Sequence, residues 1–272
     1  MDRLGKYEVR TFSKDRQNII LLTSEGKRRR NAHALLEIDV TQAREIMQKM
    51  KEEKRGDVSF TGWVIKCVAQ AVSEHKLLNA YRLGRRKLVM FDDVDISMPI
   101  EREVNGKPLL MGYIIRRANE KSIGDITQEI RNIQQKPVDA SLQAFDDQLT
   151  PWERRLLHAP LFMKKLGLVF MRRNGLLKKK HLGTIGVTAI GMKGRFPGFV
   201  IGMGGPIGTF IGIGGITKKP GVVDGRIEPR EFLHVTIHID HDVVDGGPLA
   251  RFTDRLVELL ETGFGLPSSW HT

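Results

Sequence analysis

The chain alternates between stretches with the residue pattern of a β-strand and stretches with the pattern of an amphipathic helix. Strand patterns occupy residues 35–41, 88–101, 109–118 and 232–244. Helical periodicity occupies residues 42–54, 61–73, 122–134 and 248–261, and Thr41 is the expected N-cap of the first helix. Strands separated by helices, with one long strand near the C-terminus, predict an α/β fold in which helices back an open mixed sheet.

Length and composition favour one folded domain. The chain has 272 residues, 40% of them hydrophobic and 28% charged, which is enough for a large domain with its own core. The one cysteine, Cys67, lies in an apolar helical stretch, so neither an intrachain disulfide nor a cysteine-based zinc site is expected. The first residues lack a secretory signal, and no run reaches the roughly 18 apolar residues of a membrane span. We expect a cytoplasmic protein with a single domain over residues 1–272.

The positive charge is concentrated in one part of the sequence. The formal net charge is +12, and residues 149–181 contain nine Lys or Arg residues against one acid, Glu153, which gives this segment a net charge of +8. Apolar residues such as Trp152, Phe162 and Phe170 lie between the cations, so full exposure to solvent is disfavoured. We predict a basic, apolar insert at about residues 140–181.

Three roles are open for this insert. It can pack against another subunit or protein, it can remain a solvated charged face, or residues 149–181 can contact a membrane surface. The last role suits the mixture of cations and aromatic residues, which favours anionic lipid and would make the protein membrane-peripheral. Nucleic acid is not expected as a partner, because aromatic and base-reading polar residues are not interleaved with the basic runs.

Three histidines lie close together in the last strand pattern. On the two-residue period of a strand, His234 and His238 share one face and His241 points to the other, so the three do not converge on a metal ion. For His234 and His238 we expect half-exposed structural positions. His241 begins the sequence HDVVDG, in which Asp245 can fix a turn through an ion pair and Gly246 permits close approach of a ligand. His241 is therefore the candidate acid or base.

Glycine is dense in residues 183–215, where 12 glycines occur in 33 residues. The stretch contains neither GxGxxG nor GxxxxGK[ST], so no dinucleotide or P-loop nucleotide site is predicted. We expect these glycines to allow close packing of strands and subunits.

The HDVVDG block is one of several that match a known family in chain order. The other blocks are LLEIDVTQARE, TGWVIKCVAQAVSEHKLLNAYR, MGYIIRRANEKSIGDITQEIRNI, HLGTIGVTAIGM and GGPIGTFIGIGGITKKP. Together they resemble the catalytic domain of the dihydrolipoyl acyltransferases of 2-oxo acid dehydrogenase complexes, which shares its fold with chloramphenicol acetyltransferase. HxxxDG alone recurs by chance, whereas colinear blocks over most of the chain are specific. The resemblance implies a chloramphenicol acetyltransferase-like two-layer α/β fold, a mixed sheet backed by helices.

The resemblance also implies roles for four residues. His241 matches the general base that deprotonates a thiol, and Thr188 matches the hydroxyl that stabilises the oxyanion formed when the thiol attacks a thioester. Asp245 matches a structural acid that pairs with an N-terminal arginine, for which Arg16 is the best match. The implied reaction moves an acyl group between coenzyme A and a thiol acceptor such as a dihydrolipoyl group, with no covalent enzyme intermediate and no metal.

The family pattern further implies a homotrimer in which His241 of one subunit meets Thr188 of the next. No lipoyl-attachment domain is recognisable, so a lipoyl substrate is expected to arrive on a separate lipoyl protein, and a dehydrogenase component is a further expected partner. Two positions depart from the pattern, Asp242 for arginine and Ala189 for asparagine. Two alternatives stay open: a catalytically weak scaffold or membrane-associated assembly protein, and an acyltransferase that acts on a small alcohol or amine.

Overall fold

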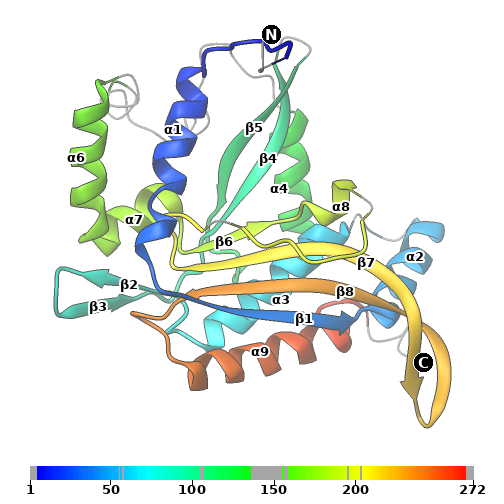
Figure 1. Ribbon diagram of the computed structural model, residues 1–272. Coiled ribbons are helices and arrows are strands. Elements are labelled where there is room, and N and C mark those ends of the chain that lie inside the picture. The colour runs from blue at the N-terminus through cyan, green and yellow to red at the C-terminus, as the bar shows by residue number, and fades with distance from the viewer. Residues whose placement is uncertain are drawn as a thin grey trace.

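A six-stranded mixed sheet organises the computed structural model, which describes residues 5–54, 56, 58–104, 107–135, 155, 159–194, 196–202 and 204–267 (Figure 1). The strand order is β1-β8-β7-β6-β4-β5. β6 runs parallel to both of its neighbours, and the other pairs are antiparallel. The strands are β1 (Asn31–Asp39), β4 (Ile96–Val104), β5 (Lys107–Ile115), β6 (Ile185–Thr188), β7 (Thr209–Val223) and β8 (Arg226–Asp240). A separate hairpin consists of β2 (Ala80–Leu83) and β3 (Lys87–Met90).

Helices cover one face of this sheet. The covering helices are α2 (Thr41–Glu52), α3 (Phe60–Glu74), α4 (Ile123–Gln135) and α9 (Gly246–Glu261). Alternate residues of β8 turn toward them and are fully buried, among them Val235, Ile237 and Ile239, where they join Trp63 of α3 and Phe252 of α9 in one core. The predicted two-layer fold, a mixed sheet backed by helices, is confirmed.

Two local predictions are wrong at the ends of elements. Helix α2 begins at Thr41 itself, and Val40 precedes it without a side-chain cap. The Asp39 carboxylate explains the difference, because it accepts hydrogen bonds from both the backbone N–H and the hydroxyl of Thr41. The last strand ends at Asp240, so that His241 lies on a turn beyond it.

The sheet face opposite the helices is also covered, and this buries two histidines that we expected to be half-exposed. Only 6% of His234 and 2% of His238 is accessible. Phe199 packs edge-on against His234, and His33 of β1 and Phe210 of β7 pack edge-on against His238. The strand period placed both rings on one face, but it did not reveal the glycine-rich segment that returns over that face.

Glycine permits this close return. A β-bulge interrupts β7 between Ile213 and Ile216, and there Gly215 donates a backbone hydrogen bond to Gly198. A Cβ atom on Gly215 would lie 1.6 Å from the carbonyl oxygen of Phe196, so no other residue fits. The predicted role of these glycines in close strand packing is confirmed within the chain.

The remaining helices are not part of the layer formed by α2, α3, α4 and α9. They are α1 (Lys14–Thr23), a 3-10 turn (Gly26–Arg28), α6 (Leu161–Arg172), α7 (Gly175–Leu182) and α8 (Gly191–Gly194). α7 packs on β2, and α6 stands next to α1 at one edge of the molecule (Figure 1). At the opposite edge the long β7–β8 hairpin extends past the body. No helix among the described residues combines the length and apolar character that a membrane crossing requires.

His238 should make the protein acid-sensitive. Neither ring nitrogen has a hydrogen-bond partner among the described residues, and burial, helped by His33, lowers the pKa of His238 from 6.5 to about 4. The unfolded chain binds the proton of His238 more readily than the folded chain does. Protonation of His238 therefore does not reduce the free energy of unfolding above pH 6.5, and it reduces this free energy progressively as the pH falls toward 4. We expect this residue alone to remove about 2 kcal/mol from the free energy of unfolding between pH 8 and pH 5.

The His238→Leu variant measures this contribution by urea unfolding at the two pH values. At pH 8 it should be at least as stable as the wild type, since an unsatisfied polar ring has been removed. Its loss of stability at pH 5 should be smaller by the stated amount. Parallel losses in both proteins would show that His238 does not cause the acid sensitivity.

Candidate active site

The turn that follows β8 carries His241, the predicted general base. Its backbone N–H donates to the carbonyl oxygen of Arg30 (2.8 Å), and the N–H of Asp240 donates to that of Gly208 (2.9 Å). The imidazole is 51% exposed, and its Nδ1 lies 3.9 Å from an oxygen of Asp245. The main chain thus fixes the turn while the ring stays open to a substrate.

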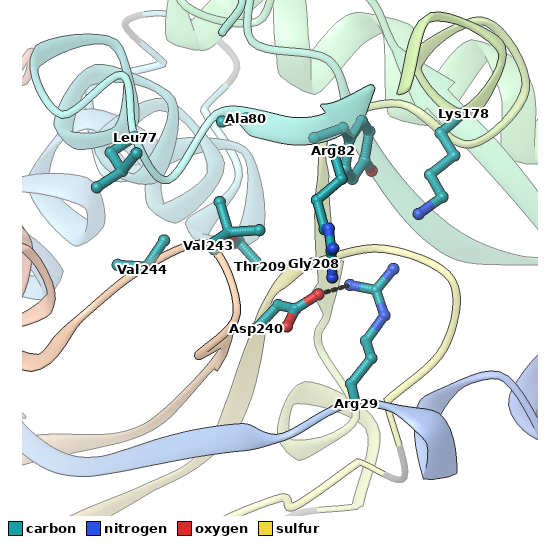
Figure 2. Close-up of a pocket in the computed structure, with 11 residues that line it drawn as sticks. Arg29, Leu77, Ala80, Arg82, Lys178, Gly208, Thr209, Asp240, Val243 and Val244 are labelled. Atoms are coloured by element: carbon teal, nitrogen blue, oxygen red, sulfur yellow. Dashed lines mark ion pairs between the residues drawn. The ribbon is translucent and has the colours of Figure 1, made fainter. Parts of the chain in front are cut away.

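Arginines hold both residues that flank His241 (Figure 2 shows the first pair). Arg29 forms an ion pair of 3.2 Å with Asp240, and both side chains are almost buried. The same guanidinium donates to the carbonyl oxygen of Pro206. Asp242 is paired with Arg30 (2.7 Å) and with Arg82 of β2 (3.3 Å). The acid that departs from the family pattern at position 242 therefore has two partners of its own.

These arginines were missed in the sequence. Arg29 and Arg30 lie about 210 residues before the turn, and the run of three arginines at 28–30 was the one signal that could have drawn attention to them. The sequence instead predicted one arginine, Arg16, as the partner of Asp245.

Arg16 and Asp245 do not meet in the described chain. Arg16 is exposed on α1, where its backbone N–H donates to the hydroxyl of Ser13. Asp245 is the N-cap residue of α9, with 85% of its side chain exposed. No ion pair joins the two among the described residues, so the pairing stays a prediction.

Thr188, the predicted oxyanion donor, is the last residue of β6. It is 6% exposed, and its hydroxyl forms no hydrogen bond with any described residue, whereas the hydroxyls of the buried Thr184 and Thr209 are bonded to main-chain oxygens. A threonine at a strand end with a free hydroxyl is available to a ligand.

The sheet register separates Thr188 from His241 within one chain. Thr188 is aligned with Gly212 of β7, which is aligned with Thr236 of β8. His241 lies five residues beyond Thr236. Two strand spacings and five residues of extended chain correspond to roughly 15–20 Å. The hydroxyl and the imidazole of the same chain therefore cannot act on one thioester.

A cationic surface adjoins the histidine turn. A cavity of about 340 Å³ is lined by Arg30, Arg82, Arg85, Arg86, Lys87, Leu88 and Asp242. Five of these seven residues are cations, so the cavity attracts anionic ligands. In the described part of the chain no group of three or more His, Cys, Asp or Glu side chains is arranged to hold a metal ion.

The fold of the chain is shared with solved catalytic cores of dihydrolipoamide acetyltransferases. It is similar to a probable dihydrolipoamide acetyltransferase from Listeria monocytogenes, with a TM-score of 0.67 and 24% identity over 95% of each chain. It is also similar to the dihydrolipoamide acetyltransferase of Azotobacter vinelandii, with a TM-score of 0.67, 20% identity, and coverage of 96% of this chain and 93% of that one.

The sequence profile described as 2-oxoacid dehydrogenases acyltransferase (catalytic domain) matches residues 11–148 and 168–266. The chain belongs to this family, and the predicted resemblance is confirmed. The profile passes over residues 149–167, which lie inside the predicted basic insert, and residues 140–154 and 156–158 of that insert are outside the described residues.

Among curated proteins, the chain is similar to the lipoamide acyltransferase component of the branched-chain alpha-keto acid dehydrogenase complex of Bacillus subtilis. The two are 25% identical over 238 residues, which is 85% of this chain and 47% of that protein. A pyruvate dehydrogenase acetyltransferase component from Corynebacterium glutamicum is 25% identical over 84% of this chain and 30% of its own length. The chain thus spans about half the length of the first of these relatives and less of the second.

Replacing Arg29 should destabilise the protein more than replacing the neighbouring Arg30. Arg29→Met leaves the nearly buried Asp240 unpaired, and we expect the free energy of unfolding to fall by about 2–4 kcal/mol. Arg30→Met is the matched control, since Arg30 is 84% exposed and Arg82 still holds Asp242; a loss below about 1 kcal/mol is expected there. Unfolding in guanidinium chloride measures the stability of both variants. Equal losses would show that the pairing of Arg29 with Asp240 does not stabilise the histidine turn.

Proposed function

We propose that the protein transfers acyl groups between coenzyme A and a thiol acceptor, such as a dihydrolipoyl group. The observation that carries this proposal is the half-exposed His241 on a turn that the main chain and Arg29 fix at the end of β8. Membership of the acyltransferase catalytic-domain family supports it. The single domain over residues 1–272 is part of the same proposal.

The chemistry follows from two side chains. A neutral His241 imidazole removes the proton from the attacking thiol, and the thiolate adds to the thioester carbonyl. The Thr188 hydroxyl donates a hydrogen bond to the resulting tetrahedral oxyanion. The carbonyl re-forms as the second thiolate leaves, and this thiolate takes the proton back from the imidazolium. No covalent enzyme intermediate and no metal ion are needed.

The site is proposed to form between subunits of a homotrimer. The register of β6, β7 and β8 supports this, because His241 and Thr188 of one chain are too far apart to share a carbonyl group. A neighbouring subunit supplies the missing hydroxyl. In the same assembly Asp245 of one subunit can pair with Arg16 of another, although the two residues form no ion pair within one chain.

The partners are proposed from the same family. Coenzyme A is a substrate, and a lipoyl group reaches the site on a separate lipoyl protein, with a dehydrogenase component as a further partner in the cytoplasm. Transfer to a small alcohol or amine uses the same base and oxyanion donor. A release assay for free coenzyme A, with dihydrolipoamide and small alcohols or amines offered as acceptors, separates these substrates.

Two inactive variants should restore activity when they are combined. Each of His241→Ala and Thr188→Ala should lower acyl transfer at least about a hundredfold. After the two are unfolded together and refolded as mixed trimers, some sites combine an intact histidine with an intact threonine. Random mixing makes about a quarter of the sites complete, so about a quarter of wild-type activity should return.

The control is the same treatment of each variant alone, which should restore nothing. Sedimentation should show that both variants keep the oligomeric state of the wild type. Activity in the mixture that stays at the level of the single variants would rule out a shared site. Unchanged turnover by His241→Ala would rule out the base itself.

A second function is favoured by the outer face of α6. Phe162, Leu166 and Phe170 follow one another at every fourth position, and between 66% and 70% of each is exposed. The opposite line of the helix faces the body: Lys164 donates to Asn18 of α1, and Leu168 is buried. The helix therefore has an apolar face that no described residue covers.

Charge favours an anionic lipid surface as the contact of this face. Arg173 and Lys165 are exposed beside it, and α6 contains no acid. In a contact between two copies related by a two-fold axis, the cations of one copy would lie against the same cations of the other, and they would repel each other. Anionic lipid accepts both the apolar side chains and the cations. We therefore propose, as the second candidate, a membrane-peripheral role in assembly through the 149–181 segment.

Liposome co-sedimentation tests the second candidate. The double variant Phe162→Ser with Phe170→Ser should lose most of its binding to anionic vesicles, because apolar area supplies much of the affinity. Val222→Ser with Ile227→Ser is the matched control, since both residues are exposed apolar side chains on the distant β7–β8 hairpin. Failure of the wild type to bind, or equal binding by both double variants, would exclude the lipid contact.

A further inference from the structure

Lys178 of α7 has a buried side chain, and no described acid forms an ion pair with its ammonium group. Only 7% of the residue is accessible. Its Nζ lies 5.2 Å from the centre of the Tyr81 ring, and it forms no hydrogen bond or ion pair with any described residue. The Tyr81 hydroxyl donates to the carbonyl oxygen of Gly183, and Lys178 lies over the Tyr81 ring.

The other charges around Lys178 already have partners. Arg29 pairs with Asp240, Arg82 pairs with Asp242, and Arg172 holds Glu25 through two hydrogen bonds of 2.5 and 2.7 Å. Each nearby acid therefore already binds an arginine. Burial, followed by the charge of Arg29, lowers the pKa of Lys178 to about 8, which still leaves the amine mostly protonated at neutral pH.

Lys178 faces a cavity at the base of the histidine turn. Two adjoining cavities, of about 10 and 130 Å³, share Arg29, Arg82, Lys178 and Asp240 in their walls. Figure 2 shows the side chains of Lys178, Arg29 and Arg82 directed toward the same space. A largely buried cation that forms no ion pair with a described acid and lines a cavity is stabilised when an anion joins it there.

We propose that Lys178, Arg29 and Arg82 form a subsite for one oxyanionic group, a carboxylate or a phosphate, of a bound substrate. Asp240 and Asp242, which flank His241, line the larger cavity, so the subsite adjoins the proposed base. Arg82 and Asp242 also line the 340 Å³ cationic cavity, which provides the approach for an anion. That the anion belongs to an acyl-transfer substrate rests on the proposed function; the anion subsite itself does not.

The carboxylate and the phosphate have different sources. A carboxylate would be the free end of a dicarboxylic acyl group, close to the reacting thioester. A phosphate would belong to coenzyme A, in which the pantetheine arm separates the phosphates from the thiol. Both groups offer several oxygens to the guanidinium groups and to the ammonium group.

Thermal unfolding with inorganic phosphate or succinate as the probe tests the subsite without any turnover. Lys178→Met should be at least as stable as the wild type in the absence of an anion, because it removes an unpaired buried charge. At least one of the two anions should raise the Tm of the wild type. The variant should bind that anion on the order of tenfold more weakly or worse.

Lys180→Met is the matched control, since it makes the same change at an exposed lysine two residues along α7. It should respond to the anion as the wild type does. A wild-type protein that responds to neither anion, an equal response of Lys178→Met, or a large loss of stability in Lys178→Met without anion would each overturn the subsite.

Kinetics then identify the source of the anion. A KM raised about tenfold in Lys178→Met for succinyl-CoA but not acetyl-CoA assigns the site to an acyl carboxylate. A KM raised for coenzyme A but not for its dephospho form assigns it to the 3′-phosphate, and a KM raised for both forms assigns it to the diphosphate. Unchanged KM values for succinyl-CoA, acetyl-CoA, coenzyme A and dephospho-coenzyme A would overturn the substrate assignment. A protein with no transferase activity would instead refute the proposed function, and the thermal result would stand apart from it.

Discussion

Strand β8 and its hydrogen-bonded register with β1 and β7 are the constraint on which the rest of the structure depends. Successive side chains of a strand point to opposite faces, so one register decides which residues enter the core and which meet the returning glycine-rich segment. Val235 and Ile237 lie among the helices, and His234 and His238 lie under the opposite cover. The same register fixes where the strand ends, and thereby where His241 is held.

Much of this could be predicted because it is local. Apolar periodicity gave the helices and strands their order, and the strand period gave His234 and His238 a common face. Colinear motifs, rather than periodicity, directed attention to His241 and Thr188. The burial of His238 could not be predicted, because it depends on a segment that returns from elsewhere in the chain. The pairing of Arg29 with Asp240 is equally remote, since about 210 residues separate the two in sequence.

The basic character of the chain also changes meaning once the residues are placed. In the sequence, residues 149–181 read as one cationic segment. In the structure, Arg172 is neutralised by Glu25, Lys179 lies near Asp93 and Asp95, and Lys178 is buried. α7 therefore belongs to the body of the domain, and exposed apolar and cationic side chains are concentrated on α6. Adjacent stretches of similar composition differ because α7 packs against the body, whereas α6 packs on one side only and leaves its apolar face exposed.

The long β7–β8 hairpin has a further consequence for how copies of this chain meet. β1 pairs with β8 as far as Phe232, and Val40 donates to the carbonyl oxygen of Glu231; beyond this point, in the outer half of the hairpin, no described strand pairs with either outer edge. Open edges invite other strands to add to them. Pro220 and Pro229 lie directly opposite each other in this half, and each removes one N–H donor from its strand. The arm is thereby protected against strand addition, and recognition of it by another molecule falls to side chains such as Val222 and Ile227.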